Sequence, residues 1–194
     1  PGNDDINNLS VKVIAEDFYG EQISQDFDLE IKNINDAPVI VKTLTGQVLE
    51  EDTFFQIMTG SAFDDIDIKH GDQLTFSAEL HTGEPLPDWL SITPNTGFLT
   101  GTPENEDVGH LNVRIIATDK EGVAVSQIIE LEITNSNDAP IIDTTKLITQ
   151  SVAEDQLDWE FKLSTAFSDP DLRIHSQTGD LNDPAETLTY SAKV

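Results

Sequence analysis

Apolar and polar residues alternate along several short segments of the chain, and a period of two is typical of half-buried β-strands. The alternation is clear at residues 74–78, 111–115 and 129–133. Turn signals with a glycine follow at residues 94–97 and 120–122. No stretch has a convincing helical period. Short strands with regular turns therefore predict an all-β chain of Greek-key β-sandwich domains.

The chain also repeats itself. Residues 1–38 recur without a gap at residues 103–140, at a constant offset of 102, with 19 identical positions. The identities include acidic and amide residues, namely Asp17/Asp119, Asn33/Asn135, Asn35/Asn137 and Asp36/Asp138. A period of one small domain indicates tandem domains joined end to end. Oxygen-bearing side chains that recur at fixed places suggest a repeated site for a hard cation.

The phrase Asn-Asp-Ala-Pro at residues 35–38 and 137–140 separates the repeats. Proline fixes the backbone and suits a short, stiff connection between domains. We therefore expect residues 1–38 to be the C-terminal part of a first repeat with its linker. Residues 39–138 are predicted to be a complete repeat, and residues 139–194 the N-terminal part of a third.

Each half-repeat is expected to expose a core face and unpaired strand edges. The two halves together make up about one sandwich. One hypothesis is that they complement each other between chains by exchange of half-domains, which would make the protein self-associate. The alternative is that a longer protein has been trimmed.

Acidic residues dominate the charge. The chain has 10 basic and 37 acidic residues, for a net charge of −27. This balance excludes nucleic acid and an anionic membrane surface as partners, because both need a basic face. No apolar run of the length of a membrane span is present, so no direct membrane insertion is expected. The chain has no cysteine, and small extracellular domains without disulfides often use a metal instead.

Six phrases in order give the chain a family resemblance. They are Ala62–Asp67, Gly71–Ala78, Leu86–Ile92, Thr96–Pro103, Ala117–Asp119 and Asn135–Pro140. Together they resemble the dystroglycan-type cadherin-like repeats of large bacterial extracellular adhesins and other surface proteins. The resemblance implies seven-stranded sandwiches stacked end to end, with Ca²⁺ bound between neighbours.

By similarity to cadherins, each junction gathers calcium ligands from both sides. At the first junction they are Asn33, Asn35, Asp36, Asp65, Asp67 and Asp119. At the second they are Glu51, Asn135, Asn137, Asp138, Asp169 and Asp171. The preceding unit is expected to add one of Asp4 and Asp5 at the first junction, and one of Glu106 and Asp107 at the second. The alternative is that these acidic side chains bind no metal and form a solvated surface.

The function predicted is a calcium-rigidified module of a bacterial adhesin or other extracellular, membrane-associated surface protein. It would act in adhesion or as a rod-like extender, with neighbouring repeats and a cell-surface glycan or protein as partners. We expect no enzyme activity, because no nucleophile or carboxylate pair stands out.

The alternative function is a carbohydrate-binding module of a secreted polysaccharide-degrading or surface protein. It depends on Trp89, whose indole could stack on a sugar ring. The competing interpretation, which the sequence favours, is that Trp89 covers the core edge beside Leu86 and Leu90. Trp159 alternates with Phe161 and Leu163, and is expected to lie in a core.

Overall fold

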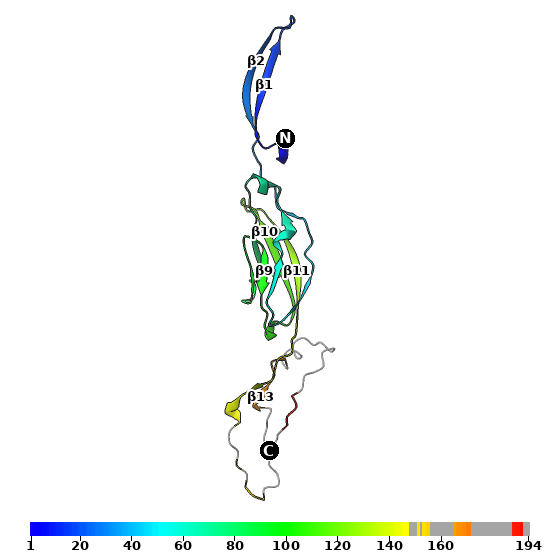
Figure 1. Cartoon of the computed structure of the whole chain (residues 1–194), viewed down its shortest axis with the longest axis vertical. Helices are drawn as coiled ribbons and strands as arrows, with labels where there is room; N and C mark the ends of the chain where they lie inside the picture. Colours follow the sequence, from blue (N-terminus) through cyan, green and yellow to red (C-terminus); the bar gives the residue numbers. More distant parts are fainter. Residues whose placement is uncertain (148–150, 152, 156–164, 172–187, 192–194) are drawn as a thin grey trace.

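The computed structural model describes residues 1–147, 151, 153–155, 165–171 and 188–191. The chain is elongated: a β-hairpin lies at the N-terminal end and a β-sandwich follows it along the long axis (Figure 1). All described regular structure is β-strand or short 3-10 helix, which confirms the predicted all-β class. No described helix is long and apolar enough to cross a membrane.

The N-terminal hairpin is a copy of the last two strands of the sandwich. Strand β1 (Asn8–Glu16) pairs with β2 (Gln22–Glu30), as β10 (Gly109–Thr118) pairs with β11 (Ala124–Thr134). The registers are equivalent, since Leu9 faces Leu29 and the corresponding Leu111 faces Leu131. The repeat in the sequence is thus a repeat in structure.

The sandwich has two main sheets and a short ribbon. One sheet has the strand order β4-β11-β10-β7, with β4 spanning Gln47–Glu50 and β7 spanning Thr75–Leu80. The other has the order β5-β9-β8, with bounds Phe55–Met58, Phe98–Gly101 and Leu90–Ile92. The ribbon pairs β3 (Val39–Ile40) with β6 (Phe63–Asp64). A similar ribbon after the second linker pairs β12 (Ile141–Ile142) with β13 (Phe167–Ser168).

The core lies between the two sheets and follows the predicted alternation. Val113, Ile115 and Leu131 are completely buried, and Ile129 is 1% exposed. The intervening residues on β11 face solvent. Burial of such aliphatic side chains is the main favourable term in folding, at about 25 cal/mol per Å² of apolar surface.

The same face of the N-terminal hairpin is open among the described residues. Leu29, the counterpart of the buried Leu131, is 44% exposed, and Phe27, the counterpart of Ile129, is 48% exposed. The hairpin therefore presents a core face that nothing covers in the described part of this chain.

In the described residues, five short 3-10 helices shape the loops. They are η1 (Asn3–Asp5), η2 (Gly60–Ala62), η3 (Ile66–His70), η4 (Asn105–Asp107) and η5 (Thr144–Lys146). η1 and η4 occupy the same place in successive repeats. In each, the third residue, Asp5 or Asp107, accepts a 2.9 Å hydrogen bond from the backbone N–H of Gly2 or Glu104.

Candidate metal centre at the domain junctions

The Asp-x-Asp pair of the sandwich is held by the start of η3. Asp65 caps this helix, and its Oδ1 accepts a 2.8 Å hydrogen bond from the backbone N–H of Asp67. Both side chains are buried, at 3% and 1% exposure. Gly71 ends η3 in the left-handed region with φ 99°, and this turn places Asp72 next to the pair.

The first linker binds directly to this end of the sandwich. The backbone N–H of Asp36 donates to Oδ2 of Asp67 at 2.6 Å, and Nδ2 of Asn35 donates to Oδ2 of Asp119 at 2.9 Å. Asn3 of η1 in turn donates to Oδ2 of Asp36 at 2.8 Å. Residues from the hairpin unit, the linker and the sandwich therefore meet at one place.

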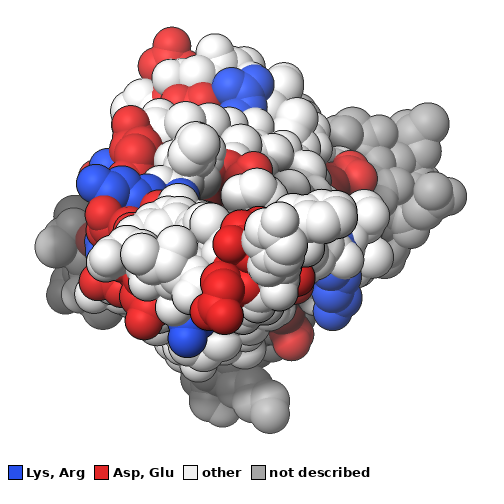
Figure 2. All heavy atoms as spheres, turned by 90° about the horizontal axis from the view of Figure 1, so that it is seen from above, with Lys and Arg blue, Asp and Glu red and all other residues white. Residues whose placement is uncertain are grey.

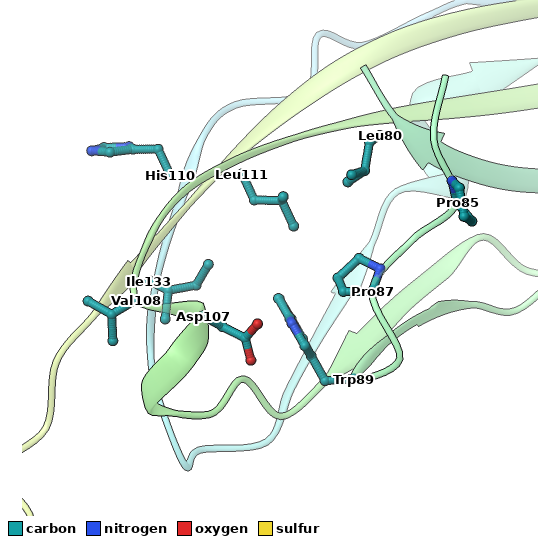
Figure 3. Close-up of a pocket in the computed structure, with 9 residues that line it drawn as sticks. All are labelled: Leu80, Pro85, Pro87, Trp89, Asp107, Val108, His110, Leu111 and Ile133. Atoms are coloured by element: carbon teal, nitrogen blue, oxygen red, sulfur yellow. The ribbon is translucent and has the colours of Figure 1, made fainter. Parts of the chain in front are cut away.

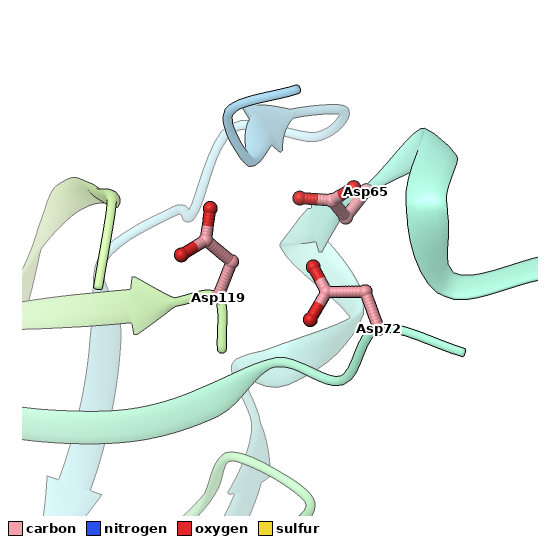
Figure 4. A group of neighbouring side chains, drawn as sticks. All are labelled: Asp65, Asp72 and Asp119. Carbon is pink, nitrogen blue, oxygen red and sulfur yellow. The ribbon is translucent and has the colours of Figure 1, made fainter. Parts of the chain in front are cut away.

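Three carboxylates converge at the first junction. Oxygen atoms of Asp65, Asp72 and Asp119 lie within 4.8 Å of one another (Figure 4). Asp119 follows β10 and Asp65 follows β6, so different strands supply the group. Asp72 was not predicted as a ligand. The one available signal was its position in the phrase Gly71–Ala78, directly after a glycine that permits a sharp turn.

Several of these oxygens lack a partner within the described residues. Oδ2 of Asp65, Oδ1 of Asp67 and Oδ2 of Asp72 are buried and accept no hydrogen bond. A buried polar group without a partner costs about 1–3 kcal/mol, and more when it is charged. Calcium takes six to eight oxygen ligands, mostly carboxylate and carbonyl. The set at this junction thus fits a hard cation, which would satisfy atoms that the protein leaves unpaired.

The electrostatics of the first junction agree with that fit. Burial raises the pKa of Asp65, and the nearby carboxylates of Asp72, Asp67 and Asp119 raise it further. The pKa of Asp119 is lowered, chiefly by the hydrogen bond from the Asn35 amide. A divalent cation would relieve the repulsion that raises the pKa of Asp65.

The second junction repeats the contacts of the first. The backbone N–H of Asp138 donates to Oδ2 of Asp171 at 2.7 Å, and Asn105 donates to Oδ2 of Asp138 at 2.7 Å. Oδ1 of Asp169 accepts from the N–H of Asp171 at 3.1 Å. Asp169 and Asp171 are buried, at 6% and 4% exposure. The two junctions are therefore built to the same plan.

Glu51 joins the second junction from the preceding sandwich. It is 1% exposed, and its Oε1 accepts a 2.7 Å hydrogen bond from the N–H of Ser136 in the linker. In the orientation that satisfies its amide, Asn135 donates to Oε1 of Glu51 at 3.0 Å and to Oδ1 of Asp171 at 3.2 Å. Oε2 of Glu51 is buried without a partner in the described part of the chain, and burial raises the pKa of this carboxyl group.

The turn that follows Glu51 has a backbone feature that recurs in the next repeat. Asp52, directly after Glu51, has φ 56°, and the corresponding Asp155 has φ 62°. Left-handed backbone at a residue other than glycine is uncommon and often marks a functional turn. The turn at Asp52 is fixed by a 2.8 Å hydrogen bond from its N–H to the carbonyl of Pro103.

Some predicted ligands do not join these clusters. Asn33 is exposed, unlike its counterpart Asn135. Asn137 is exposed and donates to the carbonyl of Asp138 at 3.0 Å, whereas its counterpart Asn35 reaches Asp119.

The carboxylates expected from η1 and η4 have other partners. Asp4 forms a 2.5 Å ion pair with Lys69, which lowers the pKa of Asp4. Asp5 and Asp107 accept from the backbone of their own turns. Glu106 is exposed. At the first junction η1 instead contributes Asn3, through its contact with Asp36 and a 2.9 Å contact of its carbonyl with Nε2 of His70.

The view along the long axis shows acidic side chains spread over the visible surface, with fewer basic ones among them (Figure 2). This distribution follows from the net charge of −27. A strongly negative surface raises the local concentration of cations.

One family comparison decides the classification of the central domain. The family described as "Putative Ig domain" matches residues 37–134. The chain belongs to this family. The Ig-domain match begins directly after Asp36 of the first linker and covers the sandwich that carries Glu51, Asp65, Asp67 and Asp119. A comparison with curated protein sequences finds no match.

Solved structures place the Ig-like sandwich among cadherin folds. Human mucin-like protocadherin EC1-2 is 15% identical with a TM-score of 0.55, and the match covers 70% of this chain and 72% of that one. Mouse cadherin-23 EC22-24 is 18% identical with a TM-score of 0.53, covering 69% and 44%. At these identities the likeness shows the fold, and the cadherin-like part of the expected resemblance is confirmed at that level.

An endo-fucoidan hydrolase from glycoside hydrolase family 107 is also similar, at 19% identity and a TM-score of 0.40. That match covers 71% of this chain but 21% of the hydrolase. The chain thus spans about a fifth of the length of that enzyme, and the weak likeness carries no argument about function.

Trp89 is part of the sandwich rather than a free surface residue. It packs against the core, with Phe55 at a ring-centroid distance of 6.2 Å in an edge-to-face arrangement. A Cβ on Gly101 would lie 2.9 Å from Cε3 of Trp89, so the indole lies against a strand with no side chain there. The predicted position at the core edge is confirmed. Trp159, Phe161 and Leu163 lie outside the described residues.

Proposed function

We propose that this chain is a calcium-binding module of an extracellular protein, in which calcium stiffens the junctions between Ig-like repeats. One observation carries the proposal. Carboxylate oxygens of Asp65, Asp72 and Asp119 converge at the junction, and buried oxygens of Asp65, Asp67 and Asp72 have no hydrogen-bond partner in the described residues. In a chain of net charge −27, a cation is the natural complement of such a group.

The chain's own residues explain how binding would stiffen the junction. Asp36 and Asn35 belong to the linker, while Asp65, Asp67 and Asp119 belong to the sandwich that follows. Their hydrogen bonds already bring the two sets together. Calcium would supply positive charge that holds carboxylates from both sides at once. At the second junction Glu51 would add a ligand from the preceding sandwich, next to Asp138 and Asp171.

In this proposal the protein acts as a rod-like extender or adhesion module rather than as an enzyme. Its partners are the neighbouring repeats and a glycan or protein on a cell surface. A bacterial surface adhesin remains the proposed setting, on the strength of the six sequence phrases. The half-buried Trp89 gives no support to the alternative, a carbohydrate-binding module, which called for an exposed indole.

Calcium titration by calorimetry, on protein stripped of metal with a chelator, tests the proposal. Saturable binding should accompany a higher melting temperature and a narrower distribution of interdomain distances in small-angle X-ray scattering. A melting curve that is the same in calcium and in excess EDTA would contradict it. Asp26→Asn is a suitable control, because Asp26 is exposed on β2, away from both junctions.

Self-association by exchange of half-domains also remains a proposal. The open core face of the β1–β2 hairpin supports it, because Leu29 and Phe27 are about half exposed where their counterparts are buried. Light scattering coupled to size-exclusion chromatography distinguishes a dimer from a monomer. A strict monomer at all concentrations would rule out the exchange.

A further inference from the structure

A cavity of about 290 Å³ opens between the two sheets of the sandwich. Its walls include Leu80 and Leu111 from the four-stranded sheet and Pro87 and Trp89 from the loop that leads into β8. Asp107 of η4 lies on the same cavity, and its carboxylate is directed toward the indole across the pocket (Figure 3). The cavity lies outside the carboxylate cluster of the first junction and shares no residue with it.

The wall of the cavity is mostly apolar. Asp107 is the one acidic residue among those that line it. Asp107 takes part in no ion pair with another described residue. His110, the remaining ionisable group on the wall, pairs instead with Glu130 at 3.3 Å. Oδ2 of Asp107 accepts a hydrogen bond from the backbone N–H of Glu104, which fixes the orientation of the carboxylate.

The aromatic side of the cavity is also held in place. Phe55 and the bare backbone of Gly101 contact the indole of Trp89. Its Nε1 is buried and donates no hydrogen bond within the described part of the chain, so packing rather than a polar contact sets the ring position. A fixed aromatic ring opposite a fixed carboxylate, with apolar walls between them, is complementary to a cation on an apolar stem.

We propose that this cavity binds a lysine side chain of a partner protein. The methylene stem would lie along Leu80, Leu111 and Pro87, and the ammonium group would lie between the carboxylate of Asp107 and the indole of Trp89. Charge complementarity supports the choice of occupant, because the chain carries a net charge of −27 and attracts basic partners. Interaction hot spots cluster in well-packed pockets that exclude water.

A pair of small probes tests the proposal on the whole chain. Nα-acetyl-lysine methylamide carries the stem and the ammonium group, and Nα-acetyl-norleucine methylamide carries the stem alone. Trp159→Phe leaves Trp89 as the one tryptophan, so its indole N–H signal in a ¹H–¹⁵N NMR spectrum reports on the pocket. Excess EDTA keeps the calcium proposal separate, since binding of the lysine probe does not depend on metal.

The lysine probe should shift the indole signal in a saturable way, and the norleucine probe should bind at least about tenfold more weakly, the scale of a charge-assisted hydrogen bond. Asp107→Asn should weaken binding of the lysine probe by a similar factor, while the amide oxygen of the new side chain can still accept the hydrogen bond from the backbone N–H of Glu104. Glu106→Gln, at the exposed neighbour, should leave binding within about twofold. Thermal melting confirms that each variant is folded.

Three results would overturn the proposal. They are equal binding of the two probes, unchanged binding of the lysine probe in folded Asp107→Asn, and no shift of the indole signal up to the solubility limit of the lysine probe. None of them bears on calcium, which is tested by the metal titration alone.

Discussion

The backbone N–H of Asp36 donates a 2.6 Å hydrogen bond to Oδ2 of Asp67 and so joins the linker to the sandwich that follows it. The same bond recurs at 2.7 Å between Asp138 and Asp171. In both cases the carboxylate is buried and belongs to an Asp-x-Asp pair. Hydrogen bonds within the protein therefore hold part of the junction together without a cation.

The first prediction concerns Asp65. Asp65→Asn keeps the cap of η3, because an amide oxygen can accept the bond from Asp67, but it removes a buried charge. The metal-free protein should gain stability on the order of 1 kcal/mol, and most of the stabilisation by calcium should disappear. Thermal melting with and without calcium measures both effects. Asp64→Asn, at the exposed neighbour, is the matched control, and an equal response of the two variants would contradict the prediction.

A second prediction concerns pH. Burial raises the pKa of both Glu51 and Asp65 in the folded protein. Such groups favour folding when protonated, below their ordinary pKa of about 4, and lose that contribution as pH rises through the raised value. In EDTA, the difference in melting temperature between the double variant Glu51→Gln/Asp65→Asn and the wild type should therefore increase in favour of the variant as the pH rises toward neutral. Saturating calcium should abolish the wild type's disadvantage, because the ion takes the place of the protons.

Asp72 provides a third test. Its Oδ1 accepts from the N–H groups of Gln73 and Lys120, at 2.6 and 3.1 Å, while its buried Oδ2 is free of protein partners in the described residues. Asp72→Asn can keep both bonds and should still lower calcium affinity by roughly tenfold, in the range of one lost charged interaction. Calorimetry measures the change. Unaltered affinity would exclude Asp72 from the site.

Much of the fold could be predicted from the sequence, because its signals are local. The period of two at residues 111–115 and 129–133 marks side chains of the core, all of them buried except the partly buried Leu111. The offset of 102 marks the hairpin that copies β10 and β11. The seven-strand scheme was too simple. Among the described residues of the sandwich, short breaks at residues 41–46 and 59–62 separate β3 from β4 and β5 from β6.

The site was harder to predict, because closure in space is not a local property. Asp72 reaches the cluster only through the left-handed turn at Gly71. The sequence offers Asp4 as a ligand, but Lys69 of the next unit pairs with it, and no sequence spacing indicates that contact. Asn33 and Asn135 are identical in the repeat, yet Asn33 is exposed while Asn135 contacts Glu51 and Asp171.

A fourth prediction compares two leucines at the same place in successive repeats. Leu131→Ala removes a completely buried side chain and should cost about 2–5 kcal/mol of stability. Leu29→Ala changes a residue that is 44% exposed and should cost much less in a monomer. Denaturant unfolding measures both. A large, concentration-dependent cost at Leu29 would instead indicate that another chain covers the hairpin.

A fifth prediction concerns two glycines. A Cβ on Gly60 would lie 2.2 Å from the carbonyl oxygen of Thr96, at the corner where Thr59 is bound to Gly97. Gly60→Ala should therefore force the backbone apart and destabilise the sandwich by about 1–3 kcal/mol. A Cβ on Gly46 would meet its nearest atom at 3.5 Å, so Gly46→Ala should be tolerated. Equal melting temperatures for the two variants would contradict the steric argument.

The parallel pairing of β4 with β11 has a mechanical consequence. Strand β4 follows the first short strand of the sandwich along the chain, and β11 leads directly into the second linker. The two run side by side from Gln47 opposite Leu131 to Glu50 opposite Thr134. A pulling force applied through the two linkers would load these hydrogen bonds in shear, all together, rather than opening them one after another. The sandwich should for that reason resist tension along the axis of the rod better than its modest size suggests.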